Sequence, residues 1–347
     1  MTVSSADVVA TQGEVRRQGI LSRVPGRTAA FAAAVGATLL WTRTMGDYGN
    51  GIVVVACINI MVVAGLHVLI HWGGQVSLGQ VAFVAIGAFA TARANADFGL
   101  PLPLAVVAGT LCAVIASAAV GIPALRLSGF ALAIVTLAFG FAAAQWLFVQ
   151  EWLVPVSTGL ALRDNSLFGF ALADSRALVI PLVLATSLVV GATIRLRASA
   201  LGRSIQAVAE DEEVAAAYGV SIGAHKLVAF LIAGGCAGLA GAFTVMSIGR
   251  VGPTVFPATQ SILYVSAVLL GGRGPLWGSL VAGASLGAFP IIAGGLGHYA
   301  GLIGPLGIVL VVRTSDEGIN GMFRRSGAAA RHLGRHVWRP QVDQEER

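Results

Sequence analysis

The chain has 347 residues, of which 56% are hydrophobic and 11% are charged, and its formal net charge at pH 7 is +6. Soluble globular domains carry about 25% charged residues, so this composition excludes that class and indicates an integral membrane protein. A transmembrane β-barrel is disfavoured because its strands alternate polar and apolar residues, whereas a run such as 129–149 is apolar on every side. The sequence therefore predicts an all-α integral membrane protein, a polytopic helical bundle.

The first 27 residues are polar and contain four arginines, and a modest apolar run follows them. A cleaved signal peptide is one interpretation of this pattern. The basic region of a signal peptide is short, however, so an uncleaved first span after a cytoplasmic N-terminal segment (1–27) is the preferred one.

Apolar windows suited to membrane helices follow one another from residue 28 to residue 313, which we take as the transmembrane domain. A straight crossing needs about 20 predominantly apolar residues. Several windows are shorter, so the prediction is 8 to 10 transmembrane helices. The first and last windows, and those that begin near Val76 and Pro257, are expected to be tilted, re-entrant or broken. The ten windows are 28–42, 51–70, 76–92, 101–122, 129–149, 177–194, 227–247, 257–272, 276–295 and 299–312.

The distribution of basic residues predicts the orientation. Ten spans place both termini on one side, and cytoplasmic loops carry an excess of Lys and Arg. With both termini cytoplasmic, five of the 22 basic residues lie outside, namely Arg43, Arg93, Arg163, Arg176 and Arg250. The Arg-rich tail, 314–347, is then cytoplasmic, and attraction to anionic lipid explains it better than nucleic-acid binding.

Two hydrophilic segments separate the spans. The external loop, 150–176, is either a substrate vestibule or a solvated connector, and the sequence leaves both open. The cytoplasmic loop, 195–226, contains helix-forming residues over Ser204–Tyr218, with Gly219 suited to cap the helix. Four acids in succession, 210–213, are unusual for a helix resting on a negatively charged leaflet, so a protein partner is favoured.

Part of this loop, Glu213–Gly219, resembles the E-A-A-x-x-x-G coupling loop of bacterial ABC importer permeases, with Val214 in place of the first alanine. Three further blocks, Gly74–Ala88, Leu125–Gly140 and Leu270–Gly278, resemble the branched-chain amino acid permease family, and in particular its LivM-type subunit. The resemblance covers about residues 40–313. It implies that the coupling residues are Arg203, Glu210, Glu213, Ala215 and Gly219.

The resemblance further implies a permease subunit of the bacterial inner membrane. Its partners would be two ATP-binding cassette subunits, a second permease of the LivH type and an extracytoplasmic solute-binding protein. The only lysine, Lys226, is not part of a phosphate-binding G-x-x-x-x-G-K-[ST] loop. ATP and Mg would therefore be bound by the partners, with no cofactor on this chain. A stand-alone secondary transporter of a small neutral or zwitterionic solute is the alternative, but it gives no reason for the acidic loop.

Uncharged polar residues are the candidates for a translocation path, because no span core contains Asp, Glu, Lys or Arg. Neutral side chains and helix ends can bind the ammonium and carboxylate of an amino acid without a buried charge. We expect Gln75, Ser77, Gln80 and Thr136 to line the path, although Ser and Thr also join membrane helices.

His67 is interpreted as a packing residue rather than a proton switch. No nucleophile, acid–base or metal-ligand pattern indicates an enzyme.

Small residues spaced four apart occur in the segment 234–241 and allow helix backbones to approach closely. Gly234, Gly238 and Gly241 are therefore predicted to mediate helix packing. Packing within the chain is favoured, and a face for a partner permease is the alternative.

Overall fold

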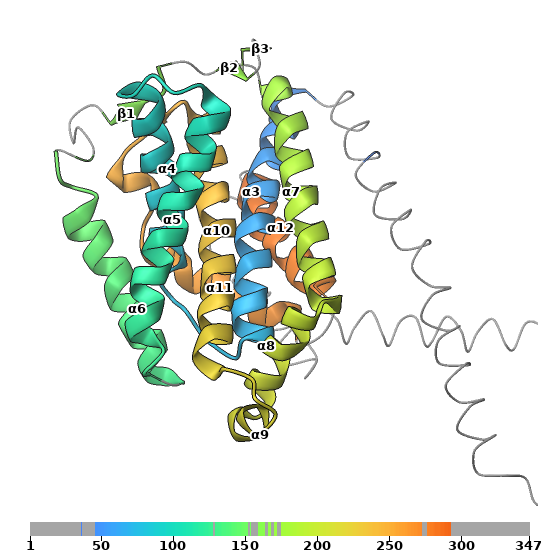
Figure 1. The fold of residues 1–347 in the computed structure, drawn as a ribbon. Helices are drawn as coiled ribbons and strands as arrows, with labels where there is room; N and C mark the ends of the chain where they lie inside the picture. Colours follow the sequence, from blue (N-terminus) through green and yellow to red (C-terminus); the bar gives the residue numbers. More distant parts are fainter. Residues whose placement is uncertain are drawn as a thin grey trace, which may run out of the picture.

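The fold was analysed in a computed structural model, which describes residue 36 and residues 46–292 apart from 128, 152, 154–158, 164–165, 168–169, 172–174 and 273–275. The described residues form a bundle of long helices with short strands at one end (Figure 1). Six of the described helices are long and apolar enough to cross a membrane. The prediction of an all-α, polytopic membrane protein is confirmed, while the first and last predicted spans, 28–42 and 299–312, lie outside the described residues.

The first part of the bundle contains four helices. Two of them, α3 and α6, continue directly into π-helical turns, η1 and η2. Pro103 is the second residue of α5, where a fixed φ and a missing backbone N–H suit the first turn of a helix. The bounds are α3 Asp47–His67, η1 Val68–Trp72, α4 Gln80–Ala96, α5 Leu102–Ala124, α6 Phe130–Ala142 and η2 Ala143–Leu147.

The second part contains the remaining helices. The longest, α10, ends at Gly249, whose φ of 74° is the left-handed conformation in which helices commonly end. The bounds are α7 Ser175–Ala198, α8 Ala200–Glu210, α9 Glu212–Ala217, α10 Ile222–Ile248, η3 Pro253–Val255, α11 Gln260–Gly271 and α12 Trp277–Ile292.

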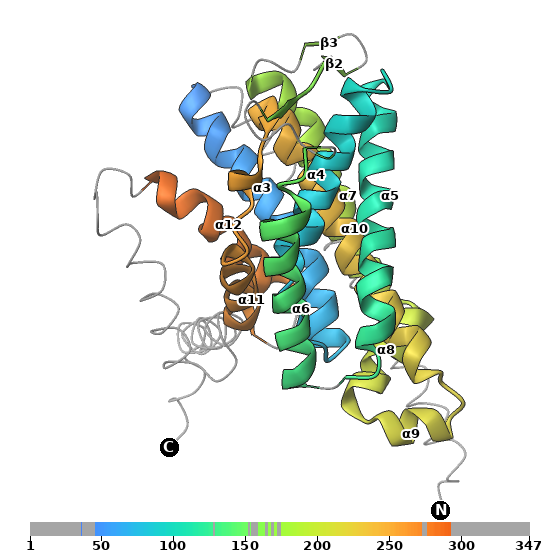
Figure 2. The ribbon, with the colours of Figure 1, turned by 90° about the vertical axis from the view of Figure 1, so that its left-hand side faces the viewer.

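Two small antiparallel sheets lie at the end of the bundle opposite α9 (Figures 1 and 2). In one, β1 (Leu160–Ala161) pairs with β4 (Arg250–Val251), and in the other β2 (Ser166–Leu167) pairs with β3 (Phe170–Ala171). The described part of the hydrophilic segment 150–176 and the hydrophilic segment 195–226 thus lie at opposite ends of the bundle, as the predicted topology requires. We call these ends the strand end and the α9 end.

The same order of elements occurs twice in the bundle. A long helix (α3 or α10) is followed by a return that contains no α-helix, then by a shorter helix (α4 or α11) and a further helix (α5 or α12). The two short helices begin side by side, because the Val81 amide of α4 donates to the Ser261 hydroxyl of α11 at 3.0 Å. Val76 and Pro257 precede their helices in non-helical backbone, so α4 and α11 begin a few residues after the predicted windows do. That these spans are tilted, re-entrant or broken stays a prediction.

Close helix contacts at glycines hold α10 against α4 and α5. A Cβ on Gly241 would lie 1.9 Å from the Val84 oxygen of α4, and one on Gly238 would lie 2.5 Å from the Ala113 Cβ of α5. A Cβ on Gly234 would lie 2.3 Å from the Ser117 hydroxyl of α5. Only a hydrogen atom fits at these distances. The three glycines therefore face helices of this chain rather than an open surface.

Candidate functional site

The hydrophilic segment 195–226 contains two short helices at the α9 end, α8 and α9, not the single helix predicted over Ser204–Tyr218. Asp211 separates them with an extended backbone, and its carboxylate accepts hydrogen bonds from the amides of Glu213 and Val214 at 2.9 and 3.0 Å. An aspartate that caps a helix satisfies amides that lack a partner within the helix. The capping function of Asp211 thus ends α8 and begins α9.

The second helix, α9, ends at Ala217, and Gly219, which was predicted to cap the helix, follows it by two residues. Gly219 has a φ of 79°, which an L side chain rarely adopts. Its amide donates to the Ala216 carbonyl at 2.9 Å, and the Val220 amide donates to the Ala215 carbonyl at 3.1 Å. This pair of bonds is a Schellman motif, and it fixes the exit of the chain from α9.

The predicted coupling residues differ in exposure. Ala215 is buried, and it holds α9 against the rest of the protein. Arg203, Glu210, Glu213 and Gly219 are exposed. Ile205 and Val208 of α8 are buried against the bundle, whereas Ala209 is exposed. The segment is thus anchored to the bundle on one side and presents acids on the other.

Sequence reasoning missed the ion pair that joins α9 to α10. The ammonium of Lys226 lies 2.6 Å from a carboxylate oxygen of Glu212, and the two side chains are 13% and 50% exposed. The signal in the sequence was the position of the only lysine at the membrane entry of α10, fourteen residues after an acid.

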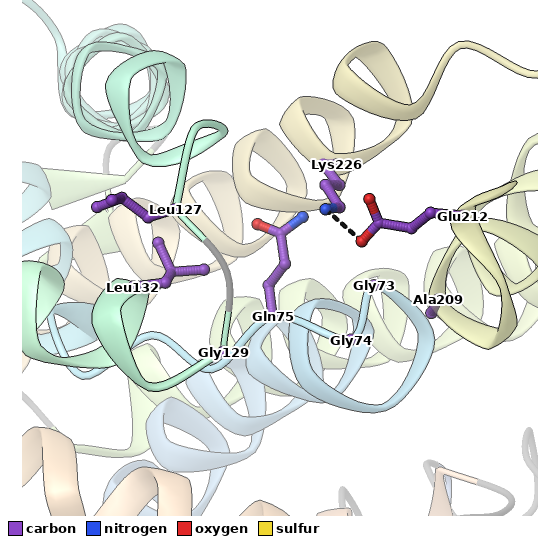
Figure 3. A pocket seen from close by; sticks show the side chains of 9 residues that line it. All are labelled: Gly73, Gly74, Gln75, Leu127, Gly129, Leu132, Ala209, Glu212 and Lys226. Carbon is purple, nitrogen blue, oxygen red and sulfur yellow. Dashed lines mark hydrogen bonds and ion pairs between the residues drawn. The ribbon is translucent and has the colours of Figure 1, made fainter. Parts of the chain in front are cut away.

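This ion pair forms one wall of a pocket at the α9 end of the bundle (Figure 3). Besides Lys226 and Glu212, the pocket is lined by the return that follows η1, by the connection between α5 and α6, and by α8. The other lining residues are Gly73, Gly74, Gln75, Leu127, Gly129, Leu132 and Ala209. Gln75, predicted to line the path, therefore lies in this pocket.

The other three predicted path residues lie together, where α4 and α11 begin. The Thr136 hydroxyl accepts a hydrogen bond from the backbone amide of Leu78 at 2.9 Å. The side-chain amide of Gln80 donates to the Ala233 carbonyl of α10 at 2.9 Å. Ser77 is fully buried and accepts from the Gly79 amide at 3.4 Å. Thr136 is the seventh residue of α6, about 9 Å along the helix at 1.5 Å per residue. The return 73–79 thus reaches into the bundle, and we call it the re-entrant segment.

Two further polar contacts join α3 to the last two described helices. The hydroxyl of Tyr264 in α11 donates to the Asn59 amide oxygen at 2.8 Å, and the His67 ring is 2.7 Å from the Ser279 hydroxyl of α12. The adjacent His71 ring donates to the Val268 carbonyl of α11 at 3.0 Å. His67 is buried and hydrogen-bonded between helices, which agrees with the packing interpretation.

Among the described residues, no group of three or more His, Cys, Asp or Glu residues is placed to hold a metal ion.

A family model described as the permease component of the branched-chain amino acid transport system matches residues 48–315. The chain belongs to this family. Its sequence is 31% identical to the high-affinity branched-chain amino acid permease protein LivM of Escherichia coli over 249 residues, which are 65% of this chain and 59% of the relative. The LivM protein of Salmonella typhimurium is 30% identical over 253 residues, or 66% of this chain and 60% of the relative.

A third relative is named for a sugar. The D-allose transport permease AlsC of Escherichia coli is 26% identical over 166 residues, which are 41% of this chain and 50% of the relative. The matched part of the chain spans about three fifths of the LivM relatives and half of AlsC. No solved structure matches the chain. The family is one of transport permeases, which agrees with the non-enzymatic interpretation of the sequence.

Proposed function

We propose that this chain is the membrane-spanning subunit of an ABC importer and forms the translocation path for branched-chain or related amino acids. The observation that carries this proposal is the pair of short helices α8 and α9, which we call the coupling segment. Ala215 anchors the segment to the bundle, and Gly219 caps its end. The segment presents exposed acids at the α9 end. A secondary transporter needs no such surface. Membership of the permease family supports the same interpretation.

The α9 end is assigned to the cytoplasm in this proposal, and both termini with it. Among the described residues, Arg126, Arg195, Arg197, Arg203 and Lys226 belong to the α9 end, and Arg93, Arg163, Arg176 and Arg250 belong to the strand end. An excess of basic residues marks cytoplasmic loops. The α9 end then meets the cassette subunits, which bind ATP and Mg, and the strand end meets the solute-binding protein.

The path itself is assigned to the region where α4 and α11 begin. Ser77, Gln80 and Thr136 lie there, and the ends of two short helices meet there. Broken helices of this kind bind the polar groups of solutes in other transporters through their ends and backbone groups. A neutral region suits a zwitterion because it offers hydrogen bonds without a fixed charge. Gln75, in the pocket, is assigned to the α9 end of the same path.

The test of the proposal is co-purification from native membranes in mild detergent. We expect a cassette subunit to remain bound in near-stoichiometric amount. Glu213→Lys and Gly219→Pro should lose that subunit, since the first reverses an exposed charge and the second removes the amide that bonds Ala216. The matched control is Glu151→Lys, which reverses an exposed charge far from α9 in the sequence and at the strand end. Recovery of the cassette subunit with both coupling variants would contradict the proposed coupling surface.

A further inference from the structure

The half-buried ion pair between Glu212 and Lys226 lies where three parts of the protein meet. Glu212 is the first residue of α9, and Lys226 lies in the second turn of α10. The side chain of Lys226 is only 13% exposed, so its ammonium has lost most of its contact with water. A cation in this position depends on its acidic partner, because a buried charge without a partner is strongly destabilising.

The third part is the re-entrant segment, which meets the ion pair through Gln75. Gln75 is 6% exposed, and its amide nitrogen has no hydrogen-bond partner. The amide points toward the Lys226 ammonium (Figure 3). A half rotation about the Cγ–Cδ bond of Gln75 exchanges the positions of its amide oxygen and nitrogen. The oxygen then faces the Lys226 ammonium and can accept a hydrogen bond from it. Lys226 thus has a carboxylate of α9 on one side and an amide of the re-entrant segment on the other.

The coupling segment also touches the re-entrant segment through backbone. Gly74 has a φ of 65°, and a Cβ placed on it would lie 3.2 Å from the Ala209 Cβ of α8. Gly74 of the re-entrant segment and Ala209 of α8 therefore lie in close contact. Movement of α8 and α9 away from the bundle would break this contact and the ion pair together.

The far end of the re-entrant segment reaches the proposed path within a few residues. Leu78, three residues after Gln75, donates to Thr136 of α6, and Val81 donates to Ser261 of α11. Three residues of extended chain span about 10 Å. A displacement at Gln75 is therefore carried directly to the place where α4, α6 and α11 meet.

We propose that Lys226, held by Glu212 and facing the Gln75 side chain in the same pocket, is the residue through which movement of the coupling helix α9 is transmitted to the re-entrant segment. In the conformation described, the ion pair locks α9 to α10 beside Gln75 of the re-entrant segment, which lines the same pocket. Withdrawal of Glu212 with α9 releases Gln75 and lets residues 73–79 shift at the proposed path. This inference rests on the proposed function for its role in transport, whereas the lock itself is a property of the chain alone.

The lock is tested first on the purified full chain, by hydrogen exchange of its backbone amides. Glu212→Gln and Lys226→Met should raise the exchange rate of the 73–79 amides by about tenfold, since each removes one partner of the half-buried pair. Amides of α5 should exchange as in the wild type, which also shows that the variants are folded. Glu151→Gln, which neutralises an exposed acid near the strand end, is the matched control. Unchanged exchange over 73–79 in both variants would overturn the lock.

The second measurement concerns transmission, in the complete transporter reconstituted in vesicles. Solute uptake per ATP hydrolysed should fall about tenfold in either single variant, because ATP-driven movement of α9 no longer reaches the re-entrant segment. The double variant Glu212→Lys with Lys226→Glu restores the pair and should recover most of this ratio. A ratio equal to the wild type in the single variants, or no recovery in the double variant, would overturn the transmission. A wild-type complex without ATP-dependent uptake would instead contradict the proposed function, and the exchange result would still decide the lock.

Discussion

Replacement of Thr136 by valine tests whether this hydroxyl holds the re-entrant segment in the bundle. Valine has nearly the shape of threonine, so the variant removes the hydroxyl and little else. The hydroxyl accepts from the Leu78 amide at 2.9 Å and lies 3.0 Å from the carbonyls of Leu132 and Ala133. The residue itself is fully buried. Its loss leaves the Leu78 amide without this partner inside an apolar bundle.

The cost of such an amide is about 1–3 kcal/mol. Because 1.4 kcal/mol is a factor of ten in population, conformations with a displaced re-entrant segment should become about 5- to 150-fold more populated. Thr136→Ser keeps the hydroxyl and should behave as the wild type. Thr193→Val is a second control, since Thr193 is also buried but its hydroxyl bonds the Val189 carbonyl of its own helix.

The assay is thermal unfolding of the chain in detergent, combined with hydrogen exchange of residues 73–79. Thr136→Val should lower the midpoint and raise exchange in that segment, while both controls should change the segment little. A Thr136→Val variant that cannot be distinguished from Thr193→Val in either measurement would refute the assignment of this bond as the anchor of the re-entrant segment.

Two further predictions concern packing and topology. Gly241→Ala places a Cβ 1.9 Å from the Val84 oxygen, so α10 and α4 must separate by about 1.5 Å, whereas a Cβ on Gly191 of α7 meets nothing within 4 Å. We expect Gly241→Ala to destabilise the chain by about 1–3 kcal/mol and Gly191→Ala to leave it unchanged or slightly stabilised, as thermal unfolding will measure. Equal midpoints would contradict the internal packing of Gly241. Topology reporters inserted after Val149 and Ala198 should report opposite sides of the membrane, and the same side for both would overturn the predicted orientation of the spans.

The membrane spans were predictable from the sequence because hydropathy alone defines them. Windows free of charge became α3, α5, α6, α7 and α10 with ends shifted by a few residues. The irregular starts of the spans near Val76 and Pro257 were also predictable, because glycine, proline and polar residues shortened those windows. Hydropathy carries no information on which helices pack together, and so it did not predict that the beginnings of α4 and α11 meet.

The coupling segment shows where local sequence reasoning fails. Helix propensity over Ser204–Tyr218 is nearly continuous, and it did not reveal that Asp211 would use its side chain as a cap and divide the segment. The acids 210–213 looked like one acidic face. Only the folded chain separates Glu212, which pairs with Lys226, from the exposed Glu213. A pairing between α9 and α10 depends on how the chain turns at Gly219, and residue spacing alone does not contain that information.

In the proposed function, this chain imports amino acids with energy from partner cassette subunits. The most direct measurement is uptake of radiolabelled leucine, and of D-allose in parallel, by vesicles that contain either the purified chain alone or the co-purified complex. We predict leucine uptake that requires the complex, ATP and the solute-binding protein, with no uptake by the chain alone under an imposed ion gradient. Ion-driven uptake by the chain alone, in the absence of ATP, would contradict the importer and identify a secondary transporter.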